Sequence, residues 1–463
     1  MGRSPMSPSM NRRTFTQMLA AATLPSARQI AGDVQRPRYH FLPKANWMND
    51  PNGLIYHQGT YHMFFQWGPD SPQAPPKDRI WGHAVSQDLV HWKHRPATPM
   101  KWSGSVVIDD GVPTAIYTGA GGQDLATSDD NMIVWRPDPA NPILKSPPPG
   151  MQLAGWRDPS VWREADGWYM LLGAGYKGVA GTALLYRSAD LRHWDYLHPL
   201  AAGTVEQRRR QDIQSGEDMW ECPDFFPLGG RHVLLASLIA FPPKGWYDRV
   251  AYYIGTYRDH KFECERMGDT DMGWVYAGKT LADARGRRIY FAWIRERRPK
   301  EEVMAAGWSG VMSLPRVLTL RSDGLLGMEP LPELELLRGR HTHVGGADIS
   351  GDGALLKDVR GDSLEIVAEF EGGTASEYGV RVRCSADGKE EYRVNVTGRR
   401  AHIFVDASVI EVFWDGRGCL TDRYYPKGAD SLGVGLFAKD GKARLKSLDV
   451  WEVNAISGDR LTS

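Results

Sequence analysis

The sequence predicts an all-β protein, a five-bladed β-propeller followed by a C-terminal β-sandwich. Three observations predict this fold class. Short strand-like runs rich in Tyr, Val, Ile and Trp recur between Gly, Pro and Asp turns, whereas helix-period patterns are scarce. Five of these runs resemble one another and lie about 50 to 65 residues apart. The pattern then changes near residue 331, where a differently spaced set of strands begins.

The repeat defines the first domain, which we assign to residues 36–330. The intervals after the first and third runs carry nearly the same phrase, SQDLVHW at 86–92 and SADLRHW at 188–194. A repeat of this length predicts a four-stranded blade, and radially arranged blades gather their innermost strands around a central channel. The five similar runs are residues 61–65, 113–117, 168–172, 232–236 and 289–293.

The second domain is assigned to residues 338–456. Segments such as 364–370, 378–384 and 409–414 alternate between apolar and polar residues, which is typical of strands with one buried face. Two such layers predict a β-sandwich.

The N-terminus, residues 1–31, is predicted to be a twin-arginine-like export signal. Residues 11–17 read NRRTFTQ, and a short apolar run at 18–24 precedes small residues. We therefore expect an exported protein, periplasmic or secreted; the alternative is a basic terminus without a targeting role. No other segment has the 18 apolar residues that a spanning helix needs.

Composition limits the classes of partner. The 463 residues carry a formal net charge of zero, which gives no electrostatic reason to expect nucleic acid or a membrane surface. The 17 Trp and 18 Tyr could stack against sugars, or could serve the core alone. The four cysteines match neither a zinc site nor a disulfide framework, and oligomeric state stays open.

Three acidic residues recur at nearly the same place in three repeats. Asp50, Asp158 and Glu221 each stand ten or eleven residues ahead of one of the similar runs, in a turn-rich setting that contains proline. A single Asp-Pro would more often only cap a turn. Three of them in equivalent positions favour a functional site, because propeller geometry brings the starts of innermost strands together.

Converging carboxylates suit acetal hydrolysis. One acid must protonate the leaving oxygen while a second carboxylate meets the positive charge that develops on the sugar. Clustering also separates the pKa values of the acids, because like charges at short range cannot all ionise easily, and this keeps one carboxyl protonated near neutral pH.

The motifs around these acids carry a resemblance. WMNDPNG at 47–53, WRDP at 156–159 and WECPD at 220–224 resemble the signature motifs of glycoside hydrolase family 32. The similarity continues through 64–66, 81–86, 102–105, 307–310 and 405–413. It implies the propeller-and-sandwich fold and a retaining hydrolase that cleaves β-fructofuranosidic bonds in sucrose or fructans such as levan and inulin.

The resemblance also implies roles for individual residues. Asp50 matches the family's nucleophile, Glu221 its general acid/base, and Asp158 the residue that stabilises the transition state by binding ring hydroxyls. No metal or organic cofactor is implied. The residues expected to bind substrate are Trp47, Asn49, Gln66, Trp81, Trp102, Ser103, Arg157 and Trp308.

Two loops depart from the family's pattern, and both are expected at the pocket rim. Residues 68–80 lack a tryptophan that related enzymes usually carry, and residues 95–101 form a shorter stretch. These differences leave the preferred substrate and the choice of exo or endo cleavage open. The alternatives to hydrolysis are fructosyl transfer through the same intermediate, a non-catalytic fructan-binding protein and a related hydrolase of arabinans.

Overall fold

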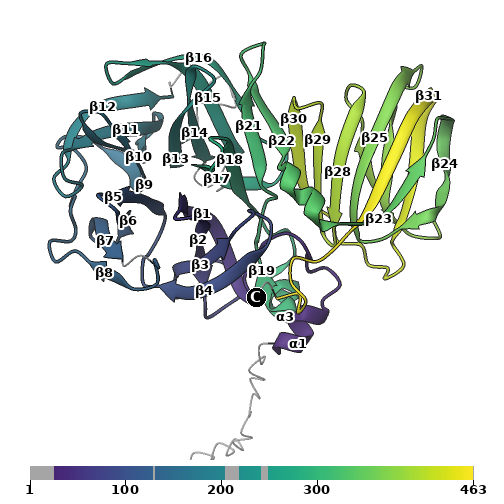
Figure 1. The fold of residues 1–463 in the computed structure, drawn as a ribbon, viewed down its shortest axis with the longest axis horizontal. Helices are drawn as coiled ribbons and strands as arrows, with labels where there is room; N and C mark the ends of the chain where they lie inside the picture. The colour runs from purple at the N-terminus through teal and green to yellow at the C-terminus, as the bar shows by residue number, and fades with distance from the viewer. Residues whose placement is uncertain (1–24, 129–130, 204–217, 241–248, 462–463) are drawn as a thin grey trace, which may run out of the picture.

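The structure, a computed structural model of the 463-residue chain, describes residues 25–128, 131–203, 218–240 and 249–461. Five sheets stand around a common axis, and a second β domain lies beside the last of them (Figure 1). The predicted fold class, a five-bladed propeller followed by a β-sandwich, is confirmed.

Each blade is an antiparallel sheet whose first strand lines the axis. The first blade contains β1 (Asn46–His57), β2 (Thr60–Gly68), β3 (Ile80–Ser86) and β4 (Trp92–Thr98). The second contains β5 (Gly104–Asp109), β6 (Val112–Gly119), β7 (Gly122–Ser128) and β8 (Trp135–Pro137). The third contains β9 (Leu153–Glu164), β10 (Gly167–Tyr176), β11 (Ala180–Ser188) and β12 (Asp195–Ala202). The fourth contains β13 (Met219–Leu228), β14 (Arg231–Ile239), β15 (Arg249–Arg258) and β16 (Lys261–Asp269). The fifth contains β17 (Val275–Ala282), β18 (Arg288–Ile294), β20 (Val311–Met312), β21 (Arg316–Leu320) and β22 (Leu326–Pro330).

The ring of blades is closed by a short parallel pairing. β19 (Trp308–Ser309), which follows the second strand of the fifth blade, pairs with the beginning of β1, so that Asn46 faces Trp308 and Trp47 faces Ser309. This contact joins the last blade to the strand that begins the first.

The repeated features of the sequence correspond to repeated structure. The five similar runs are the second strands of the five blades, β2, β6, β10, β14 and β18. The phrase at 86–92 forms a turn in which His91 bonds Asp88 and the Trp92 indole donates to the Leu89 carbonyl at 3.0 Å. The phrase at 188–194 forms the same turn, with the same bonds at the matching positions.

The C-terminal domain is a single hydrogen-bonded sheet folded into two layers. Its longest strand, β31, pairs with strands of both layers, while its apolar residues fill a core separate from that of the propeller. The strands are β23 (Arg338–Val344), β24 (Ala347–Arg360), β25 (Ser363–Gly373), β26 (Glu377–Cys384), β27 (Tyr392–Asn395), β28 (Arg400–Asp406), β29 (Val409–Trp414), β30 (Gly418–Arg423) and β31 (Gly433–Val453).

Helices are few and short. α1 (Ala27–Gly32) begins with a capping box between Ser26 and Gln29 and buries Ile30, while α3 (Lys300–Ala306) precedes β19 and a 3₁₀ turn (Pro332–Leu337) links the two domains. None of the helices in the described ranges is long and apolar enough to cross a membrane. Of residues 25–31, assigned above to the leader, Ile30 packs into the propeller core while 26–29 are exposed, and 1–24 lie outside the described residues.

A buried ionic network joins the two domains. The Arg316 guanidinium of β21 donates to Asp271 and to Glu411 of β29, both at 2.8 Å, and all three side chains are fully buried. His40 extends the network, because its ring bonds Glu411 at 3.2 Å and Asp406 at 2.8 Å. One buried network of charged side chains therefore connects the propeller, the segment ahead of it and the C-terminal domain.

Candidate active site

The three predicted acids lie where the regular pairing of innermost strands breaks. In β1 the break falls between Met48 and Pro51, in β9 between Arg157 and Ser160, and in β13 between Glu221 and Asp224. Each break places one extra residue in the innermost strand, which is a β-bulge, and bulges redirect side chains away from the usual alternation. Asp158 adopts a left-handed backbone there, with φ of 65°.

Asp50 is held by donors from neighbouring strands and loops. Its Oδ2 accepts hydrogen bonds from Ser103 Oγ at 2.6 Å and from Gln66 Nε2 at 2.9 Å, and the Cys222 thiol lies 3.5 Å away. All four side chains are buried. The Asp50 carboxylate is thus fixed in orientation.

Asp158 shares the Cys222 thiol with Asp50. The Asp158 carboxylate accepts a hydrogen bond from the Cys222 backbone N–H at 3.1 Å, and the thiol lies 3.6 Å from the same oxygen. The Asp158 backbone N–H donates to Thr118 Oγ1 at 2.8 Å. One thiol therefore contacts both the Asp50 and the Asp158 carboxyl groups, which brings these two groups close together.

Glu221 is bound from two adjacent blades. Arg157 donates to Glu221 Oε1 through Nε at 2.8 Å and through Nη2, and the Tyr276 hydroxyl donates to Oε2 at 2.6 Å. Arg157, Glu221 and Tyr276 hold the same position ahead of the bulge in β9, β13 and β17. The equivalent register explains why these side chains meet.

Burial and mutual repulsion change the acidity of the cluster. Burial, followed by the charge of Asp158, raises the pKa of Asp50 to about 7, although the Ser103 hydrogen bond acts in the opposite direction. Burial likewise raises the pKa of Asp158, against the opposing charge of Arg157. The ionisation of Asp50 therefore falls near neutral pH.

The predicted binding residues separate into two groups. Asn49, Gln66 and Ser103 are buried around Asp50, Arg157 contacts Glu221, and Trp102 is 43% exposed beside Ser103. Trp47 is buried at the beginning of β1, with 3% of its surface exposed. These residues form the first group, which lies around the carboxylates or at the rim of the site.

Two predicted binding tryptophans do not present a face to a ligand in this structure. Trp81 is fully buried against Phe64, and its indole donates to the Trp102 carbonyl. Trp308 is also fully buried; its indole donates to Asp33 at 2.7 Å and Arg298 lies 4.2 Å over its ring. In this structure both support the site through packing, and their direct contact with substrate stays a prediction.

Four residues near the carboxylates were not predicted to form part of the site. Cys222, Tyr276 and Trp293 form a small buried cluster against the acids, and Arg79 lies over the rings of Trp47 and Trp102. Tyr276 precedes the fifth similar run by 13 residues, whereas the acids precede theirs by 10 or 11, so only the strand pairing shows that its position matches that of Glu221. Trp293 ends that run. Nothing in the sequence pattern distinguishes Arg79.

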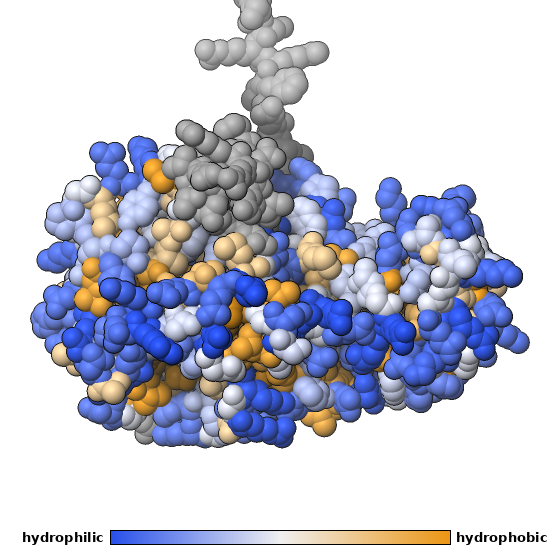
Figure 2. All heavy atoms as spheres, turned by 90° about the horizontal axis from the view of Figure 1, so that it is seen from above, coloured by the Kyte–Doolittle hydropathy of each residue, from blue (hydrophilic) through white to orange (hydrophobic). Residues whose placement is uncertain are grey.

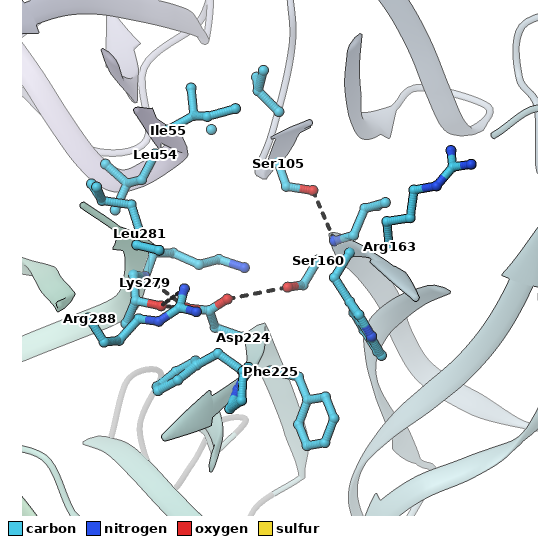
Figure 3. A pocket seen from close by; sticks show the side chains of 18 of the residues that line it. Leu54, Ile55, Ser105, Ser160, Arg163, Asp224, Phe225, Lys279, Leu281 and Arg288 are labelled. Atoms are coloured by element: carbon cyan, nitrogen blue, oxygen red, sulfur yellow. Dashed lines mark hydrogen bonds between the residues drawn. The ribbon is translucent and has the colours of Figure 1, made fainter. Parts of the chain in front are cut away.

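A cavity of about 620 Å³ occupies the opposite half of the central channel (Figure 3). It is lined by residues that follow the bulges in β1, β9, β13 and β17 and by the first residues of β5, and none of the three acids reaches it. Asp224 at its centre is already bonded by Thr280, through N at 2.8 Å and Oγ1 at 2.6 Å, and Lys279 donates to the Pro223 carbonyl at 2.6 Å. The converging carboxylates therefore identify the reaction site better than cavity size does.

The arrangement is suited to acetal cleavage. Two of the carboxyl groups can serve as nucleophile and proton donor, and a third carboxyl group lies on the innermost strand of another blade. Buried hydrogen-bond donors fix the orientation of the carboxylates. No group of three or more His, Cys, Asp or Glu side chains in the described ranges is arranged to hold a metal ion.

The face of the molecule that Figure 2 shows is mostly hydrophilic.

Comparison with known proteins gives consistent matches. Residues 40–330 match the model for the glycosyl hydrolases family 32 N-terminal domain, and residues 398–452 match the model for its C-terminal domain. A sucrose-6-phosphate hydrolase of Escherichia coli is 31% identical, over 94% of this chain and 98% of that protein. A levanase of Bacillus subtilis is 32% identical, over 91% of this chain and 71% of that protein. The solved structure of fructan 1-exohydrolase IIa from Cichorium intybus superposes with a TM-score of 0.81 at 25% identity, over 91% of this chain and 98% of that one.

Proposed function

The chain belongs to glycosyl hydrolase family 32 and hydrolyses β-fructofuranosidic bonds, and from this we propose that Asp50 is the nucleophile, Glu221 the general acid/base and Asp158 the stabiliser of the transition state. One observation carries the assignment: bulges in three innermost strands bring these acids together around the Cys222 thiol and the Arg157 guanidinium. The matches to both family models confirm the predicted family.

In the first step, Asp50 attacks the anomeric carbon while Glu221 transfers its proton to the leaving oxygen. A covalent fructosyl ester on Asp50 and a free leaving sugar result. In the second step, Glu221 removes a proton from water, which attacks the same carbon and releases fructose with retained configuration. Ser103 and Gln66 orient the attacking carboxylate throughout.

Unpaired acceptors beside Asp50 support substrate binding there. Asn49 Oδ1 and Gln66 Oε1 are buried and have no hydrogen-bond partner among the described residues. A buried acceptor without a partner costs about 1–3 kcal/mol, so such groups in a functional site usually meet a ligand. The hydroxyls of a fructosyl ring would supply the missing donors.

We propose sucrose and fructans as substrates, because relatives named raffinose invertase and levanase match most of this chain. The test is product analysis by chromatography after separate incubation with sucrose, inulin and levan. Release of fructose alone supports exo-hydrolysis and ranks the substrates. Short oligofructosides would instead indicate endo-cleavage or transfer, and absence of product from all three would contradict the proposal.

Replacing Ser103 by alanine is expected to move the acidic limb of the kcat/KM profile to higher pH, by about one unit. The Ser103 hydroxyl bonds the ionised Asp50 and lowers its pKa, so its loss leaves more Asp50 protonated at a given pH. The other charges that face Asp50 are Asp158, Glu221 and Arg79. The measurement is kcat/KM for sucrose from pH 4 to 8; an unmoved limb would mean that Asp50 does not control it.

We also propose that the protein is exported, from the NRRTFTQ pattern at residues 11–17. Replacing Arg12 and Arg13 together by lysine is expected to retain the enzyme in the cytoplasm. The measurement is fructosidase activity in cell fractions of a bacterial host with a twin-arginine pathway. Equal activity outside the cytoplasm for both forms would argue against this signal.

A further inference from the structure

The loop between β2 and β3 is a firmly held part of the pocket rim. Asn46 Nδ2 donates to the Pro69 carbonyl at 2.6 Å, the Trp47 backbone N–H donates to Ser71 O at 3.0 Å, and Ser309 Oγ donates to Pro72 O. The backbone of residues 69–72 is therefore fixed, and the loop ends in one charged side chain directly before β3.

Arg79 is that side chain, and it contacts aromatic rings. Its guanidinium carbon lies 5.2 Å from the centre of the Trp47 ring and 4.6 Å from that of Trp102, within the range of cation–π attraction. Among the described residues no hydrogen bond or ion pair of the Arg79 side chain occurs, so its N–H donors are not used by conventional acceptors.

Arg79 lies close to the residues that surround the reacting bond. Trp47 is three residues from Asp50, Trp102 precedes the Ser103 that bonds Asp50, and the charge of Arg79 acts on Asp50. Asp50, Gln66 and Ser103 are buried, whereas Trp102 is exposed. A sugar ring at the carboxylates thus fills the closed end, and whatever is attached to it extends outward along Trp102 and Arg79.

We propose that Arg79 is a specificity-determining residue that donates hydrogen bonds to the hydroxyls of the sugar on the leaving side of the scissile bond. The inference rests on the proposed catalytic roles. A guanidinium presents several donors in a planar fork, and the indoles that hold it lower the entropy lost when it binds. Its contribution depends on a leaving group with hydroxyls to receive those donors.

Two substrates separate this role from a structural one. Sucrose has a hydroxyl-rich leaving group, whereas 4-nitrophenyl β-D-fructofuranoside has a leaving group without a hydroxyl acceptor of that kind. Arg79→Gln is expected to lower kcat/KM for sucrose about 10- to 100-fold, the usual cost of losing hydrogen bonds from a charged group, and to change it less than about twofold for the aryl fructoside. Arg79→Lys, which keeps the charge but not the fork, should fall between wild type and Arg79→Gln on sucrose.

Lys101→Gln is the matched control, because it removes a positive charge from the same rim. Lys101 is exposed and paired with Asp78 at 2.6 Å, so both substrates should be cleaved as by the wild type. Equal losses on the two substrates in Arg79→Gln would overturn the inference and assign Arg79 a structural role. Failure of the wild type to release fructose from either substrate would instead reject the proposed function.

Discussion

Asp50→Ala is expected to lower kcat for sucrose by at least about 10⁴-fold, because removal of a nucleophile eliminates the covalent route. Azide should restore part of the rate, since the small anion can enter the space left by the carboxylate and attack the anomeric carbon. The product would then be fructosyl azide of inverted configuration, which NMR distinguishes from the normal product. Wild-type turnover in Asp50→Ala would exclude Asp50 as the nucleophile.

The loss of turnover should not come from loss of the fold. Burial raises the pKa of Asp50 from its ordinary value to about 7, so above that pH the folded protein must hold a charge that the unfolded chain holds more easily. Asp50→Asn should consequently be at least as stable as the wild type at pH 8. Asp109→Ala is the matched activity control, because Asp109 also lies on an innermost strand but pairs with Arg163 away from the cluster.

Arg316→Met is expected to lower the free energy of unfolding by about 3–5 kcal/mol, the usual cost of removing one partner from a buried ionic group. The substitution removes the Arg316 charge from the buried Asp271 and Glu411 carboxylates at the junction of the two domains, and leaves His40 as the remaining partner of Glu411. Burial of Glu411 is tolerated in the wild type because Arg316 and His40 lower its pKa. Thermal and urea unfolding at neutral pH measure the effect.

A surface ion pair provides the comparison for Arg316→Met. Arg340 pairs with Glu452 at 2.6 Å, but these side chains are 62% and 49% exposed. Arg340→Met should change the free energy of unfolding by less than about 1 kcal/mol, because water already solvates both groups. If both variants unfolded at the same denaturant concentration as the wild type, the buried network would not stabilise the junction.

The propeller was predictable because its information is local and repeated. Each similar run is a second strand, and the distance from each acid to its run placed all three on innermost strands. The position that each acid occupies within its bulge was not predictable. Asp50, Asp158 and Glu221 occupy successive positions relative to the break, which only strand pairing reveals.

The buried tryptophans Trp81 and Trp308 show what the motifs leave undetermined. Trp308 lies in a segment that resembles a family motif, but its exposure depends on two other residues that cover it. Asp33 is distant in the sequence and Arg298 is nearby. Arg79 shows the converse: its neighbours Trp47 and Trp102 lie on other segments, so no periodicity marks it. In both cases tertiary packing decides which ring or charge faces the pocket.

The pairing of β19 with β1 has a consequence for the order of biosynthesis. The strand that carries Asp50 leaves the ribosome well before its edge partners Trp308 and Ser309, which are translated only after the second strand of the fifth blade. Until then the nascent chain holds an open edge and an incomplete catalytic centre. Activity is thereby postponed to the late stages of translation, and a chaperone that acts on the emerging protein would encounter the first blade before it can close.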